Sequence, residues 1–375
     1  MKIVYISNSI IPSRTANSIH VMKMCQAFAD NGHEVVLLAP DRYKEYENGV
    51  NNVYMYYGVR KTFEIVKLNY GTTRYLKTIM YGYIASQKIK KIEPDLVYGR
   101  DLYGCYFSSK KYSTIFEAHT PMSNFVNRFV LNRLNIHKKY LKTVAISEAL
   151  KKILANKQNI DVDNFFVAHD GADEVVDFDD IAVLQGASNS LKVGYIGHLY
   201  RGKGMEVIEM IADKVEKDIE FHIVGGTEKD IAFWESLIHS VNVYFYGFVV
   251  QNEVTRYINA MDVCLLPNQK VIFAHGAGSW AENISDFTSP LKMFEYMAHK
   301  KAVVASDIEV LREVLNEKNS ILVDCESVNE WVGAIEKLKN SEIRNNLAKK
   351  AYGDFLENYT WKNRARLLLN VESDN

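Results

Sequence analysis

The sequence is poor in the residues that crosslink or interrupt a chain. Its 375 residues include only 4 cysteines and 6 prolines. The cysteines stand far apart within apolar runs, at Cys25, Cys105, Cys264 and Cys325. This spacing is typical of reduced, packed thiols and argues against a disulfide framework or a cysteine metal site. We therefore expect a reducing, cytoplasmic environment.

Long hydrophobic runs are also missing. No segment reaches ~18 uninterrupted apolar residues, and Met1 and Lys2 lead directly into the strand-like residues 3–6, without the hydrophobic segment of a signal peptide. The composition, with 47% hydrophobic and 24% charged residues, is that of a folded globular chain. We predict that the protein is neither exported nor membrane-spanning.

Neither sign of charge dominates the whole chain, but the charge is unevenly distributed. The net charge is -1, yet residues 51–150 carry 16 Lys and Arg against 6 Asp and Glu. A basic region of this kind can attract an anionic membrane surface or a nucleic acid, or it can simply be a solvated basic face. We expect no nucleic-acid partner.

Alternating strand-like and helical patterns are abundant. Residues 2–7 are typical of a buried strand, residues 21–28 have helical spacing, and residues 35–39 form the next expected strand. This order builds parallel, doubly wound sheets. Further strands are expected at 96–98, 113–116 and 143–146, and then, after the acidic stretch 177–190, at 191–196, 221–224, 243–246, 263–267, 302–305 and 320–323.

The restart of this pattern predicts two domains, because 375 residues exceed what one hydrophobic core usually supports. We predict an α/β protein with two doubly wound, Rossmann-like domains, residues 1–185 and 186–356. A helix within residues 357–375 would pack back on the first domain. Ligands of such folds bind at the carboxyl ends of the strands, so we expect the active site in a cleft between the domains.

The most informative segment is 288–298. Ser289 is a good N-cap and Pro290 is favoured at the first helical position, so a helix should start there. Lys292 lies in the first turn, where its charge opposes the helix dipole unless an anion is bound. Glu295 follows one turn later, within reach of sugar hydroxyls. The alternative is an ordinary capped helix with a solvated lysine.

A second cationic loop spans residues 197–204, between an expected strand and an expected helix. Its glycines, His198 and Lys203 would lie at the carboxyl edge of the same sheet. Two cationic loops that each start a helix in one domain suggest a diphosphate ligand. A NAD-dependent oxidoreductase is disfavoured, because Gly-x-Gly-x-x-Gly does not follow the first strand.

In order and spacing, these segments resemble the retaining glycosyltransferases of GT-B fold in family 4. The resemblance spans nearly the whole chain. The matching segments are 16–21, 145–151, 169–173, 197–204, 223–226, 246–249, 289–298 and 359–361.

The resemblance implies that the second domain binds the donor nucleotide. Lys203 matches the basic residue that binds donor phosphate, whereas the usual arginine five residues earlier is His198 here. Glu295 matches the ribose-binding acid. The usual partner of this acid would fall at Phe287, and the adjacent Asp286 could serve instead. In this Ser-Pro-Leu-Lys variant, main-chain groups around Leu291 would bind the phosphates.

Other matches concern the base, the sugar and the acceptor. Gly225, Phe248 and Val249 would flank the nucleobase, or they are simply tight strand ends. His119 would face the transferred sugar, although a lone histidine is often structural. The expected catalytic set is Lys203, Glu295 and His119. On the acceptor side we expect Ala16 and Asn17, which stand near the place of the family's paired glycines, and Arg100, which with Asp101 could instead form a surface ion pair.

The predicted reaction is transfer of a sugar from a nucleotide diphosphate sugar to a hydroxyl of a glycan or lipid-linked acceptor, as in bacterial surface polysaccharide synthesis. No metal and no other cofactor is expected. Residues 74–91 and 125–142 combine apolar and basic side chains and could contact the inner face of the plasma membrane, although the first stripe could equally be core. The alternatives are a GT-B sugar-nucleotide epimerase and a non-catalytic sugar-nucleotide-binding protein.

Overall fold

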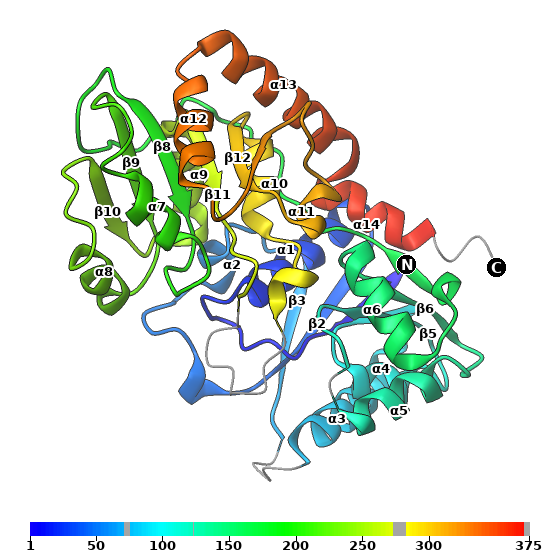
Figure 1. The fold of residues 1–375 in the computed structure, drawn as a ribbon. Coiled ribbons are helices and arrows are strands. Elements are labelled where there is room, and N and C mark those ends of the chain that lie inside the picture. The colour runs from blue at the N-terminus through cyan, green and yellow to red at the C-terminus, as the bar shows by residue number, and fades with distance from the viewer. Residues whose placement is uncertain (71–75, 123, 273–282, 371–375) are drawn as a thin grey trace. The chain divides into compact units, whose positions relative to one another are not determined.

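The computed structural model describes residues 1–70, 76–122, 124–272 and 283–370, which divide into two compact units (Figure 1). Unit 1 contains Met1–Asp170 and the residues from Trp361 onward, and unit 2 contains Gly171–Thr360. The predicted boundary after residue 185 therefore lies later than the observed one, and the predicted boundary after residue 356 lies earlier.

Unit 1 is built on a parallel sheet with the strand order β3-β2-β1-β4-β5-β6-β7. In the register of the sheet, Ile3 of the central strand pairs with Val35 on one side and Leu96 on the other. The strands are β1 (Lys2–Ile6), β2 (Glu34–Pro40), β3 (Glu64–Leu68), β4 (Leu96–Gly99), β5 (Ser113–Ala118), β6 (Tyr140–Ala145) and β7 (Phe165–Val167). The two strands that were not predicted, β3 and β7, are the two edges of this sheet.

Helices connect the parallel strands of unit 1, as such a sheet requires. Most of them begin at a polar side chain that accepts a hydrogen bond from the first turn. They are α1 (Ala16–Asp30), η1 (Tyr43–Glu45), α2 (Val53–Tyr56), α3 (Lys77–Ile92), α4 (Leu102–Ser108), α5 (Phe125–Leu134), α6 (Glu148–Gln158), η2 (Val162–Asn164) and α14 (Trp361–Asn370). The last of these, drawn in red in Figure 1, comes from the end of the chain and packs against α1.

Unit 2 repeats the architecture with the parallel strand order β10-β9-β8-β11-β12-β13. Its strands are β8 (Leu191–Ile196), β9 (Ile219–Val224), β10 (Val243–Gly247), β11 (Val263–Leu266), β12 (Ala302–Ser306) and β13 (Ile321–Val323). Its helices are α7 (Met205–Ile211), α8 (Glu228–Glu235), α9 (Gln251–Ala260), η3 (Ile284–Asp286), α10 (Leu291–Ala298), α11 (Glu309–Arg312), α12 (Val328–Lys337) and α13 (Ser341–Asn358). All six predicted strands of this half are present.

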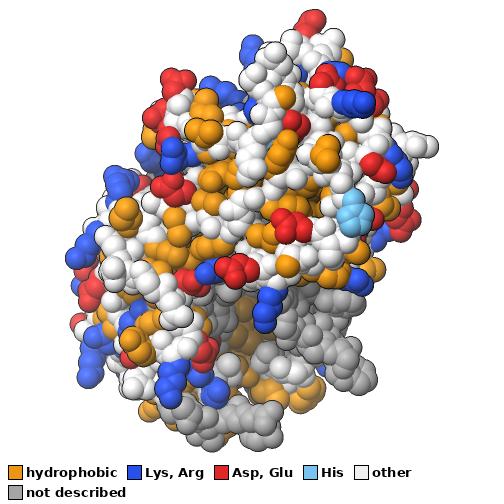
Figure 2. All heavy atoms as spheres, turned by 90° about the vertical axis from the view of Figure 1, so that its left-hand side faces the viewer, with side chains coloured by type: hydrophobic (Ala, Val, Ile, Leu, Met, Phe, Trp, Pro, Cys, Tyr) orange, Lys and Arg blue, Asp and Glu red, His pale blue; other side chains and the backbone are white. Residues whose placement is uncertain are grey.

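The surface of the chain mixes both signs of charge with scattered hydrophobic side chains, as the face drawn in Figure 2 shows. In unit 2 the exposed hydrophobic side chains include Phe233, Leu237 and Val241. None of the helices among the described residues is long and apolar enough to cross a membrane.

Candidate functional site

In unit 2, the ends of three neighbouring strands approach one another through glycines. The N–H of Gly197, after β8, donates to Val224, and the N–H of Gly225, after β9, donates to Gly247 at the end of β10. Gly225 has φ +122°, and a Cβ there would lie 2.0 Å from the carbonyl oxygen of Gly197. Only glycine allows this approach of backbone to backbone. The glycine therefore allows the ends of β8 and β9 to lie this close together.

Helix α10 is held over this edge by a buried tyrosine. The hydroxyl of Tyr296 accepts a hydrogen bond of 3.0 Å from the N–H of Ile196 in β8. The helix begins at Leu291 with Pro290 at the N-cap position and without a side-chain cap. The predicted start, with Ser289 as N-cap and Pro290 as the first helical residue, is therefore wrong by one position. Ser289 is buried instead.

Lys292 extends from the first turn of α10 to the end of β8. Its Nζ lies 3.8 Å from the centroid of the Tyr195 ring, and a Cβ at Gly197 would lie 3.4 Å from it. The Nζ is buried and has no hydrogen-bond partner in the part of the chain that the structure describes. The predicted alternative of a solvated lysine is therefore wrong. Burial, and then the neighbouring charge of Lys203, holds the pKa of Lys292 well below its usual value.

Lys203 brings a second cation to the same place. It lies in the turn before α7, where its N–H donates to the carbonyl of Tyr200 and its Nζ lies 5.4 Å from that ring. Burial lowers the pKa of Lys203 to about 8. We call Lys203 and Lys292 the lysine pair. Two like charges at low dielectric favour an anion between them.

The other predicted donor residues lie around the lysine pair. Glu295, on the next turn of α10, accepts a hydrogen bond of 2.6 Å from Gln251 of α9. His198 is exposed, and its carbonyl accepts from the Tyr195 hydroxyl at 2.7 Å. Asp286 is exposed in η3 and accepts from Asn283.

The predicted base-flanking residues follow β10. Phe248, directly after the strand, is 39% exposed. Val249 comes next and is partly buried. Gly225 follows β9, which is next to β10 in the same sheet. Its close approach to Gly197 is sufficient to explain why this residue is a glycine, whether or not a ligand binds.

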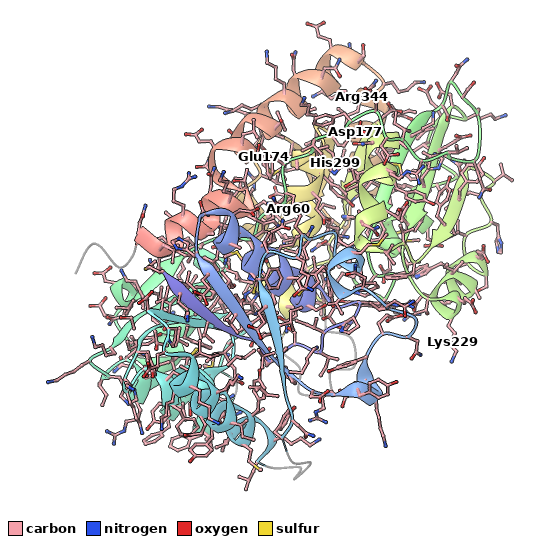
Figure 3. The ribbon with its side chains drawn as sticks, turned by 180° about the vertical axis from the view of Figure 1, so that it is seen from behind. Arg60, Glu174, Asp177, Lys229, His299 and Arg344 are labelled. Atoms are coloured by element: carbon pink, nitrogen blue, oxygen red, sulfur yellow. The ribbon has the colours of Figure 1, made fainter. Side chains whose placement is uncertain are left out.

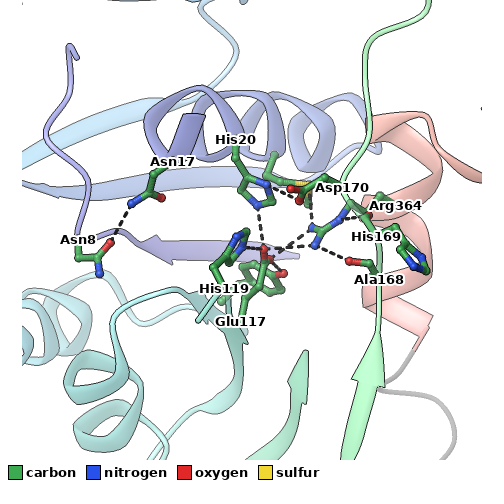
Figure 4. Close-up of polar contacts among 11 residues, drawn as sticks. Asn8, Asn17, His20, Glu117, His119, Ala168, His169, Asp170 and Arg364 are labelled. Atoms are coloured by element: carbon green, nitrogen blue, oxygen red, sulfur yellow. Dashed lines mark hydrogen bonds and ion pairs between the residues drawn. The ribbon is translucent and has the colours of Figure 1, made fainter. Parts of the chain in front are cut away.

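In unit 1, His119 belongs to a buried ion cluster (Figure 4). Its Nε2 hydrogen-bonds Glu117, which is 1% exposed. His20 of α1 lies between two carboxylates, with Nε2 2.9 Å from Glu117 and Nδ1 2.9 Å from Asp170. Arg364 of α14 completes the cluster, with Nη2 3.2 Å from Glu117.

The ionisation of this cluster follows from burial and pairing. Burial raises the pKa of Glu117, but Arg364, His20 and His119 outweigh it and hold that pKa well below its usual value. Burial and the charge of Arg100 lower the pKa of His119 to about 3, against the opposite effect of Glu117. His119 is therefore a neutral imidazole at physiological pH.

Four members of the cluster, His20, Glu117, His119 and Asp170, are of types that can bind metals, and their ligand atoms lie within 4.8 Å of one another. The carboxylate of Glu117, however, is already shared by a guanidinium, two imidazoles and the hydroxyl of Tyr98. The guanidinium of Arg364 already neutralises Glu117, the carboxylate that a metal ion would have to bind. We interpret the cluster as an ion network.

The remaining acceptor-side predictions fall near the same edge of unit 1. Arg100 follows β4, and its Nη1 is buried without a hydrogen-bond partner among the residues described. Burial lowers the pKa of Arg100 to about 10. Asp101 is 4% exposed and caps α4 by accepting from Gly104 at 2.6 Å, so the predicted surface ion pair is wrong. Asn17 hydrogen-bonds Asn8, and Ala16 is the exposed first residue of α1.

The sequence interpretation missed most of the ion cluster as a site. Glu117 could have been found, because it stands two residues before His119 at the end of a strand and so points to the same side. His20, Asp170 and Arg364 lie in segments that carried the family resemblance, but nothing local shows that they meet.

Comparisons with known proteins match both halves of the chain to glycosyltransferases. Residues 18–175 match the family model described as Glycosyltransferase Family 4, and residues 190–341 match the model described as Glycosyl transferases group 1. The chain belongs to the family 4 glycosyltransferases of GT-B fold. It is thus a glycosyltransferase, and the lysine pair lies in the half that the group 1 model covers.

Individual relatives of this glycosyltransferase are distant in sequence. An uncharacterized glycosyltransferase of Methanocaldococcus jannaschii is 25% identical, over 96% of this chain and 95% of the relative. The crystal structure of Anabaena HepE with UDP has a TM-score of 0.71 at 14% identity, with 100% of both chains covered. HepE has also been solved with UDP-glucose. A glycosyltransferase from Rickettsia africae has a TM-score of 0.74 at 15% identity, covering 100% of this chain and 98% of its own.

Proposed function

We propose that this glycosyltransferase moves a sugar from a nucleoside diphosphate sugar to a hydroxyl of a glycan or lipid-linked acceptor, with retention at the anomeric carbon. The observation that carries the proposal is the lysine pair. The Nζ of Lys292 is buried and has no hydrogen-bond partner among the described residues, and Lys203 adds a second positive charge beside it. HepE, which shares the fold, binds UDP and UDP-glucose.

The lysine pair suits a diphosphate for an electrostatic reason. Burying a cation without a partner costs free energy, and this cost is removed when an anion binds beside it. Backbone N–H groups at the start of α10 add positive potential at the same place. Lys292 therefore takes over the role of the arginine that the family usually carries at position 198.

The same arrangement would assist the reaction. During transfer, the bond between the anomeric carbon and the diphosphate oxygen breaks, and a bond from that carbon to the acceptor oxygen forms. The departing diphosphate takes the electron pair of the broken bond, so negative charge grows on it, and one of its oxygens takes the proton that the acceptor hydroxyl loses. Lys203 and Lys292 would stabilise that charge more in the transition state than in the ground state. No metal is needed for this step.

The sugar and ribose contacts are proposed for Glu295 and His119. Glu295 is held by Gln251, which orients its carboxylate at the start of α10. A carboxylate accepts hydrogen bonds from ribose hydroxyls, and a neutral imidazole can accept one from a sugar hydroxyl. Asp286 remains a proposed partner of the donor sugar.

The first experiment identifies the donor. A thermal-shift screen with UDP, GDP and ADP sugars should find one base that raises the melting temperature, since binding to the native state stabilises it. The variants Lys203→Ala and Lys292→Ala should each lose at least about tenfold in affinity for that nucleotide. The control is Lys229→Ala, an exposed lysine on α8 (Figure 3). Unchanged affinity in both site variants would refute the site.

The second experiment separates the three candidate activities. A transferase passes label from the donor to an acceptor, and an epimerase releases a free epimerised sugar without one. A non-catalytic binding protein shows the thermal shift alone. We expect transfer, abolished in Lys203→Ala.

A lipid-linked acceptor is supported by two helices of unit 1. On α5, Phe125 is 75% exposed and Phe129 50% exposed. Basic side chains accompany them, and the guanidinium of Arg133 lies 5.3 Å from the ring of Phe129. Apolar tips beside cations are typical of a surface that binds anionic lipids. This supports an acceptor in bacterial surface polysaccharide synthesis, at the inner face of the plasma membrane.

Helix α3 also exposes apolar side chains. Its buried face is formed by Tyr81, Ala85 and Ile89. The predicted stripe lies elsewhere on the helix: Leu76 and Tyr83 are about half exposed, at 50% and 54%, so the stripe is not simply core. Five side chains line a hollow of about 260 Å³, namely Ile79, Met80, Tyr83, Ile84 and Phe107.

We expect the protein to sediment with vesicles that contain anionic lipid. Double substitution of Phe125 and Phe129 by Ser should abolish this, and equal recovery of both proteins would contradict it.

A further inference from the structure

Arg364 occupies an unusual place for a charged side chain. It is 2% exposed and comes from α14, far along the chain from the residues it contacts. Its Nε donates to the carbonyl of His169 at 2.8 Å, and its Nη2 donates to the carbonyl of Ala168 at 3.1 Å. The remaining contacts go to Glu117, at 3.2 and 3.4 Å, and to the sulfur of Met24 at 3.3 Å.

These contacts keep the buried carboxylate of Glu117 ionised. A carboxyl group at 1% exposure would otherwise favour its neutral form, because burial penalises the charge. The guanidinium of Arg364 contacts both of its oxygens. An ionised carboxylate can only accept hydrogen bonds. Every nitrogen that faces Glu117 must therefore present a proton to it.

We propose that Arg364 is a positioning residue, which acts through Glu117 to hold His119 in the tautomer with its proton on Nε2. Nδ1 is then left as a hydrogen-bond acceptor for a hydroxyl of the donor sugar. The sugar contact rests on the proposed function, whereas the tautomer does not. The geometry that carries the inference is the chain of contacts from Arg364 to Glu117 and from Glu117 to Nε2 of His119.

The surroundings of His119 agree with a single neutral tautomer. Its pKa of about 3 leaves one ring proton throughout the physiological range. The other groups near the ring are Arg100, whose charge disfavours an imidazolium, and His20, whose ring lies edge-on at 4.8 Å. If Glu117 became protonated, it could donate to Nε2. The proton of His119 would then move to Nδ1, and the acceptor would become a donor.

The test is the nitrogen NMR spectrum of the histidine-labelled full chain, in which the two tautomers have different patterns of one- and two-bond couplings. His119→Asn identifies the signals of His119 among the 10 histidines. We expect the Nε2–H pattern in the unmodified protein, unchanged between pH 6 and 8. Arg364→Met should populate the Nδ1–H form, and Arg364→Lys should restore part of the original pattern. Arg366→Met, on an exposed position of the same helix, should change nothing.

Two results would overturn the inference. One is an Nδ1–H or doubly protonated His119 in the unmodified protein at pH 7, which requires only the assignment variant His119→Asn to fold. The other is an unchanged tautomer in folded Arg364→Met. In the transfer assay, Arg364→Met should lower kcat at least about tenfold with UDP affinity unchanged. Because the NMR measurement needs no substrate, failure of the proposed function and failure of tautomer control give different results.

Discussion

The pKa of Lys203 lies close to physiological pH, so its charge, and with it ligand binding, should depend on pH. Without ligand, burial places its pKa at about 8, while a bound diphosphate favours the protonated form and raises that pKa. Affinity for the nucleotide should therefore be greatest below pH 8 and fall by up to about tenfold per pH unit above it.

Calorimetry in buffers of different protonation enthalpy measures the same effect as proton uptake. When the nucleotide binds at pH 8, Lys203 should take up about half a proton, and Lys292 should take up more. Lys203→Met should remove the proton uptake that is due to Lys203. An affinity that stays constant from pH 7 to 9.5 would contradict this account.

A single glycine also decides whether the ends of β8, β9 and β10 can come together. Gly225→Ala places a Cβ against the carbonyl of Gly197, where both partners are backbone and cannot move aside, and φ +122° adds strain. We expect a loss of about 2 kcal/mol or more in the free energy of unfolding, together with weaker nucleotide binding. The control is Gly353→Ala in α13, where nothing lies within 4 Å of the new methyl group. That variant should be about 0.5–1 kcal/mol more stable.

At the scale of elements, α14 is part of the core of unit 1 although it comes from the other end of the chain. Leu368 is 0% exposed and its neighbour Leu367 is 46% exposed. Leu368→Ala should therefore cost about 2–5 kcal/mol, because it leaves a cavity between α14 and α1. Leu367→Ala should change stability by less than about 0.5 kcal/mol. Native-state hydrogen exchange in α1 and β1 measures both, and equal effects would show that α14 is only loosely attached.

The start of α4 supplies an element-scale pH dependence. Burial raises the pKa of its cap, Asp101, to about 7, against the opposite effect of the hydrogen bond from Gly104. A carboxyl group with a raised folded-state pKa stabilises the fold at low pH, and this stability is lost as pH rises from about 4 to 7. Asp101→Asn can still accept from Gly104 and carries no charge. It should exceed the unmodified protein in stability at pH 8 by up to about 4 kcal/mol, and the difference should close toward pH 4.

Urea unfolding at pH 5 and pH 8 measures that difference. Asp161→Asn is the matched control, because Asp161 also caps a short helix but is exposed. A difference for Asp101→Asn that does not change between the two pH values would show that the carboxyl group is not protonated in the fold.

At the scale of the whole molecule, the two units should respond differently to a nucleotide. The lysine pair and α10 belong to unit 2, so hydrogen exchange with UDP or its equivalent should slow mainly in residues 197–204 and 289–295. At a ligand concentration a hundred times Kd, the stabilisation is about 2.7 kcal/mol. Protection centred on residues 1–170 would move the nucleotide site to unit 1 and refute the assignment.

Local patterning in the sequence located most of the strands, and the resemblance in the order and spacing of the segments identified the family. Hydrophobic runs between turn residues located eleven of the strands, because a buried parallel strand is apolar on both faces. They missed β3, an edge strand whose residues Glu64 to Lys67 are exposed or only partly buried, and β7, which has only three residues. Lys292 could be selected because a cation at a helix start is locally unusual. Lys203 and Glu295 could be selected because they match residues of the family that the sequence resembles.

The tertiary structure alone decided what those side chains experience. Sequence placed Lys292 on a helix, but only the packing of α10 over β8 buries its Nζ against Tyr195 and makes it a partner for an anion. Likewise, nothing near Glu117 in sequence indicates that Arg364 neutralises it. Helix and strand patterns arise from neighbours along the chain, whereas burial and charge pairing arise from residues that meet only when the chain folds.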